Sequence, residues 1–342
     1  MESPSRAWII AGLLVVYLVW GSTYLAIRVA VETMPPFLMA GVRFLVAGVI
    51  MTMALMAMKK FKATPSQWAF NILIGLFLLL GGNGLVSWAE QTVPSGIATL
   101  VVSFNPLMIV GAEWLIFGYS KGRLGAKPNA MVFAGMGVGL VGLGLLVSPS
   151  LYAEAGGGHD PWRIGAIILA CLAWTIGSMM VRYSKNPVDP FSGSAIQMLG
   201  GGVWLLLFGG LIGEFGQADW SAFSYRSIIA WWYLVIAGSL LTFTTYVWLT
   251  KHASPTLVST YAYVNPVVAV FLGWLMLNEV IDRNTYVAAA IIIAGVALIT
   301  VGKSKKPAAD SNETTASEKI KSSESTKSST DGSVAAAVQS DS

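Results

Sequence analysis

Ten apolar stretches, each about as long as a membrane-spanning helix, constrain the fold of this chain more than any other feature. A helix needs roughly 20 mainly apolar residues to cross the hydrocarbon core of a bilayer. Hydrophobic residues make up 55% of the chain and charged residues only 11%, a composition outside the soluble range. The sequence therefore predicts an all-α membrane protein with ten transmembrane helices near residues 8–27, 38–58, 68–88, 95–117, 129–149, 163–181, 191–213, 228–249, 256–277 and 285–302.

The segment from residue 303 to residue 342 has a different character. It is rich in Ser, Thr, Lys and acidic residues and contains no aromatic residue. Such a segment cannot bury enough apolar surface to offset the entropy lost on ordering. We predict a disordered cytoplasmic tail without chemistry of its own.

Basic residues near the ends of the stretches predict the orientation of the chain, because Lys and Arg gather on the cytoplasmic side of membrane proteins. With a cytoplasmic N-terminus, thirteen basic residues flank the stretches on the inside and only four on the outside, namely Arg28, Arg163, Arg226 and Arg283. We therefore expect both termini in the cytoplasm and a location in the plasma or inner membrane. Because the basic clusters are explained as topology anchors, no nucleic-acid partner is expected.

The chain also contains an internal duplication. With an offset of 160 residues it matches itself at Trp88 and Trp248, Asn105 and Asn265, Pro106 and Pro266, Trp114 and Trp274, Arg123 and Arg283, and Gly135 and Gly295. Earlier in each half the offset is 154, which pairs Trp20 with Trp174, Arg28 with Arg182, and Pro36-Phe37 with Pro190-Phe191. The six-residue difference predicts an insertion in the polar segment EFGQADWSAFSY. We divide the chain into a first repeat at 1–150, a second repeat at 151–302 and the tail at 303–342.

Each repeat holds five stretches, and this odd number makes the second repeat enter the membrane with the opposite orientation. Two inverted repeats, related by a pseudo-twofold axis in the membrane plane, are typical of secondary transporters. In such proteins the substrate site lies near the midplane between the repeats. Polar residues in the middle of the stretches are therefore the first candidates for a binding site.

An Asn-Pro pair lies in the middle of the fourth stretch and again in the ninth. Asn105 and Asn265 each lie ten residues into their stretch, about 15 Å along a helix and so near the centre of a core about 30 Å thick. The proline kinks each helix, and irregular backbone at that depth is tolerated only where protein or a water-filled cavity satisfies it. We predict that both helices bend around a central polar cavity. The alternative is a packing kink whose asparagine bonds a neighbouring helix.

Arg43 follows Pro36 by seven residues, which places it roughly 10 Å inside the membrane. An intramembrane charge is a functional hypothesis by default, although an ion pair with Glu90 or Glu113, or snorkelling to the interface, would also account for it. If Arg43 faces the cavity, its guanidinium suits a carboxylate on the substrate. Its counterpart in the second repeat is Gln197, which is a further candidate for substrate binding.

Other candidates share helix faces with these residues or could form aromatic walls. They are Trp20, Tyr24, Asn83, Trp88, Trp174, Tyr246, Trp248 and Tyr261. For any single tryptophan, the alternative is a place in the apolar core or in the interfacial belt. Tyr261 is preferred to Tyr263 because it lies four residues before Asn265 and so on the same helix face.

Two further features leave alternatives open. Glu113 is a candidate for proton coupling, and a surface ion pair near the basic cluster at Lys121 is its alternative. The glycine-dense GMGVGLVGLG of the fifth stretch supports close helix contact, either within the chain or in a homodimer through this stretch or the tenth. Cys171 is the only cysteine and the chain has two histidines, so we expect neither a metal nor a cofactor.

Four segments resemble a known family: WGSTYLAIR, MPPFLMAGVRFLVAG, GNGLVSWAEQTVPSGIATLVVSFNPL and SPTLVSTYAYVNPVVAVFLGWLMLNEVI. They are similar to EamA-type transporters of the ten-span drug/metabolite transporter superfamily, and to its YedA-like branch, over about residues 8–302. The resemblance implies an exporter or exchanger of amino acids, metabolites or related amphiphiles, with a central cavity that opens alternately to the two sides. The second repeat has Glu279 where the first has Tyr119, so symmetry assigns Glu279 no role.

We therefore expect a secondary transporter that exports small organic solutes, with Arg43 as anion anchor and Asn105 and Asn265 as a hydrogen-bonding pair. A facilitative channel built from the same kinked helices is the alternative. An enzyme is not expected, because the stretches contain no His, Asp and Ser constellation. The expected partners are a small-molecule substrate and the lipid bilayer.

Overall fold

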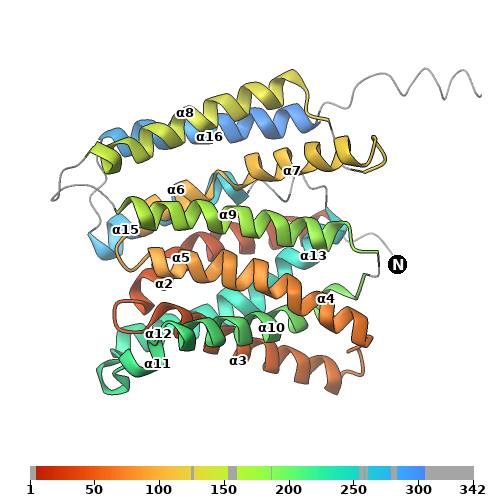
Figure 1. The fold of residues 1–342 in the computed structure, drawn as a ribbon, viewed down its shortest axis with the longest axis vertical. Helices are drawn as coiled ribbons and strands as arrows, with labels where there is room; N and C mark the ends of the chain where they lie inside the picture. Colours follow the sequence, from red (N-terminus) through yellow and green to blue (C-terminus); the bar gives the residue numbers. More distant parts are fainter. Residues whose placement is uncertain are drawn as a thin grey trace, which may run out of the picture. The chain divides into compact units, whose positions relative to one another are not determined.

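The computed structural model describes residues 5–124, 127–152, 160–185, 187–253, 258, 261–278 and 283–304, and these residues form helices without any strand (Figure 1). The all-α prediction is confirmed for these residues. The packing described below lies within the unit formed by residues 1–303. The predicted tail lies outside the described residues from residue 305 onwards.

Helices occur on all ten predicted stretches. Residues 1–150 contribute α1 (Arg6–Val15), η1 (Val16–Trp20), α2 (Gly21–Ala30), α3 (Pro36–Ala57), α4 (Pro65–Gly75), η2 (Leu76–Gly84), α5 (Leu85–Ala89), α6 (Ser95–Val102), α7 (Asn105–Tyr119) and α8 (Ala130–Tyr152). The later residues contribute α9 (Pro161–Arg182), α10 (Pro190–Leu211), α11 (Glu214–Gln217), η3 (Trp220–Ala222), α12 (Tyr225–Tyr233), η4 (Leu234–Phe243), α13 (Thr244–His252), α15 (Tyr261–Leu277) and α16 (Arg283–Ser304).

Seven helical segments within the described residues are long and apolar enough to cross a membrane. They are Arg6–Ala30, Pro36–Ala57, Pro65–Ala89, Ser95–Tyr119, Pro161–Arg182, Pro190–Leu211 and Tyr225–Leu249. The helices α8, α15 and α16 lie on the other three predicted stretches. The ten-span count stays a prediction.

Helix starts in this chain follow from local sequence signals. Proline occupies the first position of α3, α4, α9 and α10, where its fixed φ suits the helix and its missing N–H costs no hydrogen bond. Thr64 and Gln67 form a capping box at the start of α4. The Asp160 carboxylate accepts a hydrogen bond from the Trp162 N–H at the start of α9.

The segments η2 and η4 are π-helical, which means that their backbone hydrogen bonds join residues five apart and that each turn holds more residues than a turn of α-helix. They lie at corresponding places of the two repeats, because an offset of 160 residues brings η2 into overlap with η4. A π-helical segment changes the face on which the following side chains lie. The 3.6-residue periodicity used to read the sequence therefore does not hold through these two stretches.

The helices α3 and α10, which are counterparts by the offset of 154 residues, pack directly against each other through glycines. A Cβ added to Gly48 would lie 2.9 Å from the backbone nitrogen of Leu199. A Cβ added to its counterpart, Gly202, would lie 2.9 Å from the backbone nitrogen of Leu45, which is the counterpart of Leu199. Contacts that are reciprocal in this way are characteristic of a twofold axis. The two repeats are therefore related by a local pseudo-twofold axis at this seam.

The helices α8 and α16 lie side by side and form a second reciprocal seam (Figure 1). A Cβ on Gly142 would lie 2.9 Å from the Ile292 nitrogen, and one on its counterpart Gly302 would lie 3.1 Å from the nitrogen of Val132, the counterpart of Ile292. A Cβ on Gly295 would lie only 2.6 Å from the nitrogen of Gly139. The predicted glycine contact is thus found within the chain, and the homodimer stays a prediction.

The predicted six-residue insertion is confirmed by the helix bounds. Residues 58–64 connect α3 to α4, whereas residues 212–224 connect the counterpart helices α10 and α12 and include α11. Glu214 at the start of α11 accepts hydrogen bonds from the backbone N–H groups of Phe37 and Leu38, at 3.2 and 2.7 Å. The insertion of the second repeat therefore caps the first turn of α3 in the first repeat.

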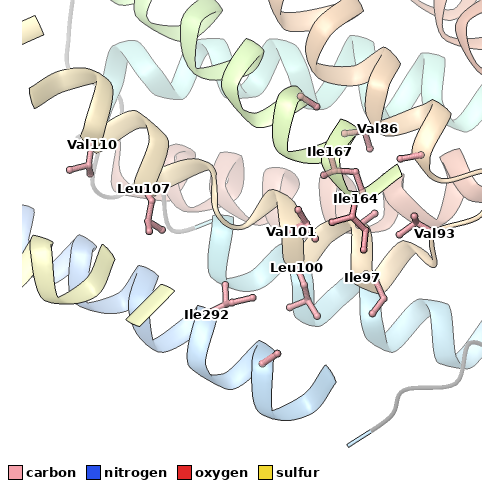
Figure 2. Close-up of a cluster of buried hydrophobic side chains, with 14 of the residues drawn as sticks. Val86, Val93, Ile97, Leu100, Val101, Leu107, Val110, Ile164, Ile167 and Ile292 are labelled. Atoms are coloured by element: carbon pink, nitrogen blue, oxygen red, sulfur yellow. The ribbon is translucent and has the colours of Figure 1, made fainter. Parts of the chain in front are cut away.

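A cluster of buried apolar side chains joins the two repeats next to α9 (Figure 2). It contains Val86, Val93, Ile97, Leu100, Val101, Leu107, Val110, Ile164, Ile167 and Ile292, among others. These residues come from α5, α6, α7, α9 and α16 and from the turn before α6. The apolar packing therefore fixes the broken helix α6–α7 against the second repeat.

Candidate functional site

A cavity of about 100 Å³ lies between the two repeats. Its walls come from the first, second, third and fourth helical segments of the first repeat and from α9, η4 and α15 of the second. The candidates that line it are Trp20, Tyr24, Arg43, Asn83, Asn105, Trp174, Tyr261 and Asn265. The structure thus brings eight of the twelve predicted substrate-binding residues to one cavity.

Arg43 on α3 is the one charged residue among the described residues that line the cavity, and only 3% of its surface is exposed. Its Nε donates a hydrogen bond to the Ser239 hydroxyl on η4 at 3.0 Å. The guanidinium carbon lies 4.6 Å from the centre of the Phe44 ring, and a Cβ on Gly238 would lie 3.0 Å from Nη2. Its Nη1 has no hydrogen-bond partner within the described part of the chain. Ser239 therefore holds the Nε edge of the Arg43 guanidinium, whereas the Nη1 donor has no described partner.

Two further buried atoms in the cavity wall have no hydrogen-bond partner among the described residues. They are the side-chain oxygen of Asn83 on η2 and the indole nitrogen of Trp174 on α9. Leaving a buried polar group unsatisfied costs about 1–3 kcal/mol, so such groups normally find a partner in protein, water or ligand. With Arg43 Nη1, these are two donors and one acceptor without a described partner, on residues that line the cavity.

The Asn-Pro pair of the first repeat lies at a break in the helix. The helix α6 ends at Val102 and α7 begins at Asn105, with Pro106 in its first turn. The Asn105 side-chain oxygen accepts a hydrogen bond of 2.9 Å from the Thr175 hydroxyl on α9. The break predicted from Pro106 is therefore present, and the asparagine bonds a neighbouring helix at the cavity wall.

The Asn-Pro pair of the second repeat is arranged differently. The helix α15 continues through Pro266 from Tyr261 to Leu277. The Asn265 amide is satisfied when its nitrogen faces the carbonyl oxygens of Tyr17 and Tyr261, at 3.1 and 3.3 Å, and we assign it in this orientation from the hydrogen-bond network. Asn265 therefore donates hydrogen bonds, whereas Asn105 accepts one.

An aromatic cluster closes part of the cavity around Trp20. Its ring centre lies 6.1 Å from that of its counterpart Trp174, 4.8 Å from that of Tyr246 and 5.5 Å from that of Tyr261. Tyr246 belongs to this cluster but is not part of the cavity wall. The contact between Trp20 and Trp174 joins two symmetry-related positions, as expected close to the pseudo-twofold axis.

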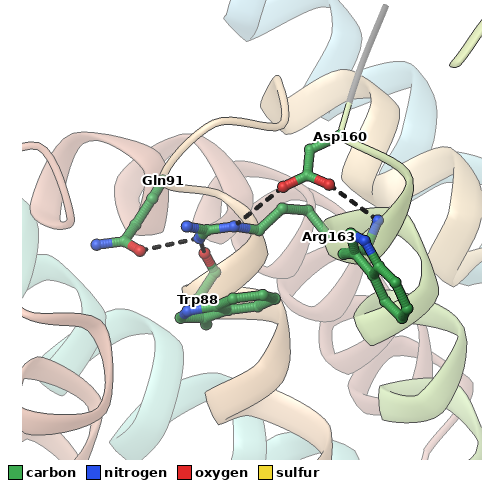
Figure 3. A network of polar contacts seen from close by, with 5 residues as sticks. Trp88, Gln91, Asp160 and Arg163 are labelled. Carbon is green, nitrogen blue, oxygen red and sulfur yellow. Dashed lines mark hydrogen bonds and ion pairs between the residues drawn. The ribbon is translucent and has the colours of Figure 1, made fainter. Parts of the chain in front are cut away.

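Trp88 lies outside the cavity lining, and its ring is covered by Arg163. The guanidinium carbon of Arg163 lies 3.8 Å from the centre of the Trp88 ring, a cation–π arrangement. The same side chain donates hydrogen bonds to the Trp88 carbonyl and the Gln91 side chain and lies 3.8 Å from the Asp160 carboxylate (Figure 3). Arg163 therefore links the end of α5 to the start of α9, and Trp88 takes part in that link.

Three other predicted residues also lie away from the cavity lining. The Gln197 amide donates a hydrogen bond of 2.8 Å to the Asn71 side chain within the contact of α10 and α4. Trp248 stacks on the His252 ring with their centres 4.7 Å apart. Glu113 forms an ion pair of 3.4 Å with Arg182, which is the ion-pair alternative found with a different partner.

Sequence reasoning did not find Ser239 or Thr175, which orient Arg43 and Asn105. Ser239 lies in η4, where the π-helical register removes the periodic signal. Thr175 directly follows Trp174, and the duplication aligns it with Gly21, so no repeated residue type marks it. Among the described residues there is no group of His, Cys, Asp and Glu that could hold a metal ion.

A model of the EamA-like transporter family matches this chain twice, at residues 7–148 and 161–301. The chain is 37% identical over 301 residues to YedA of Escherichia coli K12, described as an uncharacterized inner membrane transporter, covering 86% of this chain and 92% of that protein. It is 25% identical over 310 residues to the uncharacterized transporter YoaV of Bacillus subtilis, covering 87% and 98%.

A plant relative and a solved structure also match most of this chain. The chloroplastic WAT1-related protein At3g02690 of Arabidopsis thaliana is 26% identical over 296 residues, covering 82% of this chain and 66% of that protein. A solved crystal structure superposes with a TM-score of 0.61 at 22% identity, covering 87% of this chain and 98% of the other. The likeness to the crystal structure concerns the fold alone.

Proposed function

This chain belongs to the EamA-like transporter family, and from that premise we propose that it is a secondary transporter that exports small organic solutes by alternating access. The observation that carries this proposal is the central cavity, whose wall is built by both repeats and includes residues with buried polar atoms that have no partner in the described part of the chain. A site shared by two repeats can open to either side when the repeats rock against each other.

The size of the cavity supports a cycle of several conformations. It measures about 100 Å³, whereas pockets for small organic ligands measure about 300–1,000 Å³. A solute of metabolite size therefore requires the cavity to widen, and alternating access supplies such a change. The two glycine seams, at α3 with α10 and α8 with α16, let backbones of the two repeats approach closely.

The proposal includes ten spans, arranged as two inverted five-helix repeats with both termini in the cytoplasm. The reciprocal contacts at the two seams support the pseudo-twofold relation, and the thirteen basic residues near one set of helix ends support the orientation. The name of the relative YedA includes the inner membrane, and we propose the same location here. Reporter tags fused to each terminus would test the orientation: tags on opposite sides would contradict it.

Transport measurements test the function and separate it from a channel. Comparison of the metabolites released by cells with and without the protein identifies candidate solutes, which are then examined in proteoliposomes. A transporter shows saturation and counterflow, whereas a channel shows neither. Arg43→Ala and Asn265→Ala should abolish counterflow while the protein still inserts and purifies normally. Wild-type rates in both variants would remove these residues from the site.

A proposed coupling role for Glu113 has a separate test. Glu113 is only 6% exposed, and its carboxylate pairs with Arg182 across the contact between α7 and α9. If Glu113 couples transport to protons, Glu113→Gln should retain counterflow and lose acceleration by a pH gradient. Unchanged acceleration would leave Glu113 as a structural ion pair.

A further inference from the structure

We propose that the central cavity selects organic monocarboxylates over zwitterions and cations, with the carboxylate held by the free donors of Arg43 and Trp174. This inference rests on the proposed function, because it names the chemistry of the solute in the same cavity. It is carried by the charges and unpartnered atoms of the cavity wall.

Among the described residues that line the cavity, Arg43 alone carries a charge, and none is Asp, Glu or Lys. Arg43 hydrogen-bonds to a neutral hydroxyl on Ser239 rather than to a carboxylate. A buried charge without a counter-ion is costly. A monoanionic solute would neutralise this charge, whereas a zwitterion would leave it uncompensated and a cation would add to it.

The free donors match the acceptors of a carboxylate. The Nε of Arg43 is occupied by Ser239, which leaves Nη1 available, and the Trp174 indole N–H is a second buried donor without a described partner. Hydrogen bonds from guanidinium to carboxylate are charge-assisted and are stronger than those between neutral groups. A neutral amide in place of the carboxylate would lose the charge-assisted bond and place its NH₂ group against donors.

An ammonium group would find no carboxylate among the described residues that line this cavity. The Asn105 side-chain oxygen already accepts a hydrogen bond from Thr175, and Asn83 provides one free oxygen without a charge. A single amide oxygen can bind a hydroxyl of the solute but does not compensate a buried cation. The aromatic wall of Trp20, Tyr24 and Tyr261 suits the apolar body of the solute.

Three matched probes test this selectivity on the purified full-length protein: phenylacetate, phenylacetamide and phenylglycine. They share a phenyl ring and differ in whether the polar end is anionic, neutral or zwitterionic. Dissociation constants are obtained from the dependence of the unfolding temperature on probe concentration. We expect phenylacetate to bind at least about tenfold more tightly than either other probe, the effect of one charge-assisted hydrogen bond. Equal binding of the three probes, or binding of none, overturns the proposal.

Two variants assign the selectivity to Arg43 and to the contact that orients it. Arg43→Gln should reduce the ratio of phenylacetate to phenylacetamide affinity to about one, because it removes the charge that distinguishes the probes. Ser239→Ala should reduce the ratio partially, since Ser239 is a positioning residue for the guanidinium. Arg123→Gln, which removes an exposed arginine in the turn after α7, is the matched control and should retain the full ratio. A full ratio in Arg43→Gln also overturns the proposal.

Counterflow of radiolabelled phenylacetate in proteoliposomes separates this inference from the proposed function. Selective binding of phenylacetate without counterflow would contradict transport and leave the anion site intact. Saturable counterflow of a cationic or neutral solute, together with equal binding of the probes, would support transport and contradict the anion site.

Discussion

The two Asn-Pro pairs are identical in sequence, but the structure uses them in opposite ways. Asn105 follows a helix break and accepts a hydrogen bond from Thr175 on α9. Asn265 lies within the continuous helix α15 and donates to the carbonyls of Tyr17 and Tyr261. The duplication therefore preserves the residue and its place in the cavity wall, while its hydrogen-bond partners differ between the two repeats.

A single residue in the neighbouring helix explains much of this difference. Thr175 on α9 is the counterpart of Gly21 at the start of α2. A Cβ on Gly21 would lie 2.7 Å from the Val268 Cβ and 3.3 Å from the Asn265 carbonyl oxygen, so the backbone there approaches α15 closely. In the second pair the neighbouring segment η1 offers the Tyr17 carbonyl and α15 itself offers the Tyr261 carbonyl, instead of a hydroxyl.

The same contrast applies to the pair of Arg43 and Gln197. Arg43 reaches the cavity, whereas Gln197 bonds Asn71 in the contact of α10 with α4. The pseudo-twofold axis therefore relates a charged position in the site to a neutral position in a helix contact. Among the described lining residues, the one charge therefore belongs to the first repeat.

The largest effect is expected from Gln197→Arg, which would make the second repeat resemble the first. Gln197 is only 6% exposed, and a cation there would have no carboxylate among the partners that the structure describes for Gln197. We expect a loss of about 3 kcal/mol or more, seen as a large fall in unfolding temperature. Arg43→Gln is the reciprocal control and should not lower the unfolding temperature. Equal unfolding temperatures of Gln197→Arg and the wild type would show that the two positions are equivalent.

Asp substitutions distinguish the donor asparagine from the acceptor asparagine. Asn105 and Asn265 are 5% and 4% exposed, so an Asp at either position meets a similar cost of burial. Asn105→Asp retains an oxygen for the Thr175 hydroxyl, whereas Asn265→Asp removes the NH₂ group that faces two carbonyls. We expect Asn265→Asp to be less stable than Asn105→Asp by about 2 kcal/mol in thermal unfolding. Equal losses would contradict the opposite roles of the two amides.

Substitutions at the two counterpart positions Gly21 and Thr175 should each lower the stability of the folded protein by about 1–3 kcal/mol. Gly21→Ala would force its Cβ against Val268, and such overpacking costs about 1–3 kcal/mol. Thr175→Val removes one hydroxyl at nearly constant volume and should cost about 1 kcal/mol by loss of the bond to Asn105. Unfolding temperatures of the two variants measure both losses. A Gly21→Ala variant that unfolds at the same temperature as the wild type would show that α2 and α15 can separate without cost.

The smallest effect concerns Glu214, which has no equivalent in the shorter connection of the first repeat. Burial raises the pKa of its carboxyl group, and the hydrogen bonds from the Leu38 and Phe37 N–H groups oppose this shift. Because the folded protein then binds the proton more readily than the unfolded chain, this contribution to stability is present at low pH. It is lost as the pH rises through the folded-state pKa.

Unfolding temperatures of the wild type and Glu214→Gln measured from pH 7 down to pH 4 check this sign. The wild type should gain stability relative to Glu214→Gln as the pH falls, because only the wild type takes up this proton. A relative loss of wild-type stability on acidification would indicate that the two N–H donors outweigh burial and lower the pKa.

Sequence reasoning predicted the fold well because its signals are local or repeated. The apolar stretches gave the helices to within a few residues wherever the structure describes them, and the change of offset located the insertion that contains Glu214. The site was predicted less completely. Arg43 and the two asparagines reach one cavity, whereas Trp88, Gln197, Trp248 and Glu113 face other partners.

The misplaced residues have a common physical cause. Helical periodicity gives the angle between side chains of one helix, but not which face meets the cavity and which meets a neighbour. The π-helical segments η2 and η4 add a further rotation that the sequence does not mark. Trp88 and Trp248 lie downstream of these segments, and Arg163 and His252 cover their rings.

The sequence by itself determined that the chain folds in a membrane, where its helices lie and how it is duplicated, because apolar length, proline and repeat offsets act along the chain. Only the tertiary structure decided which duplicated positions reach the cavity: both Asn105 and Asn265, and Arg43 but not its counterpart Gln197. That choice depends on glycine contacts between α3 and α10, on the hydroxyls of Ser239 and Thr175, and on π-helical turns. These are contacts between segments far apart in the chain, where hydrogen-bond satisfaction and close packing select one partner for each polar group.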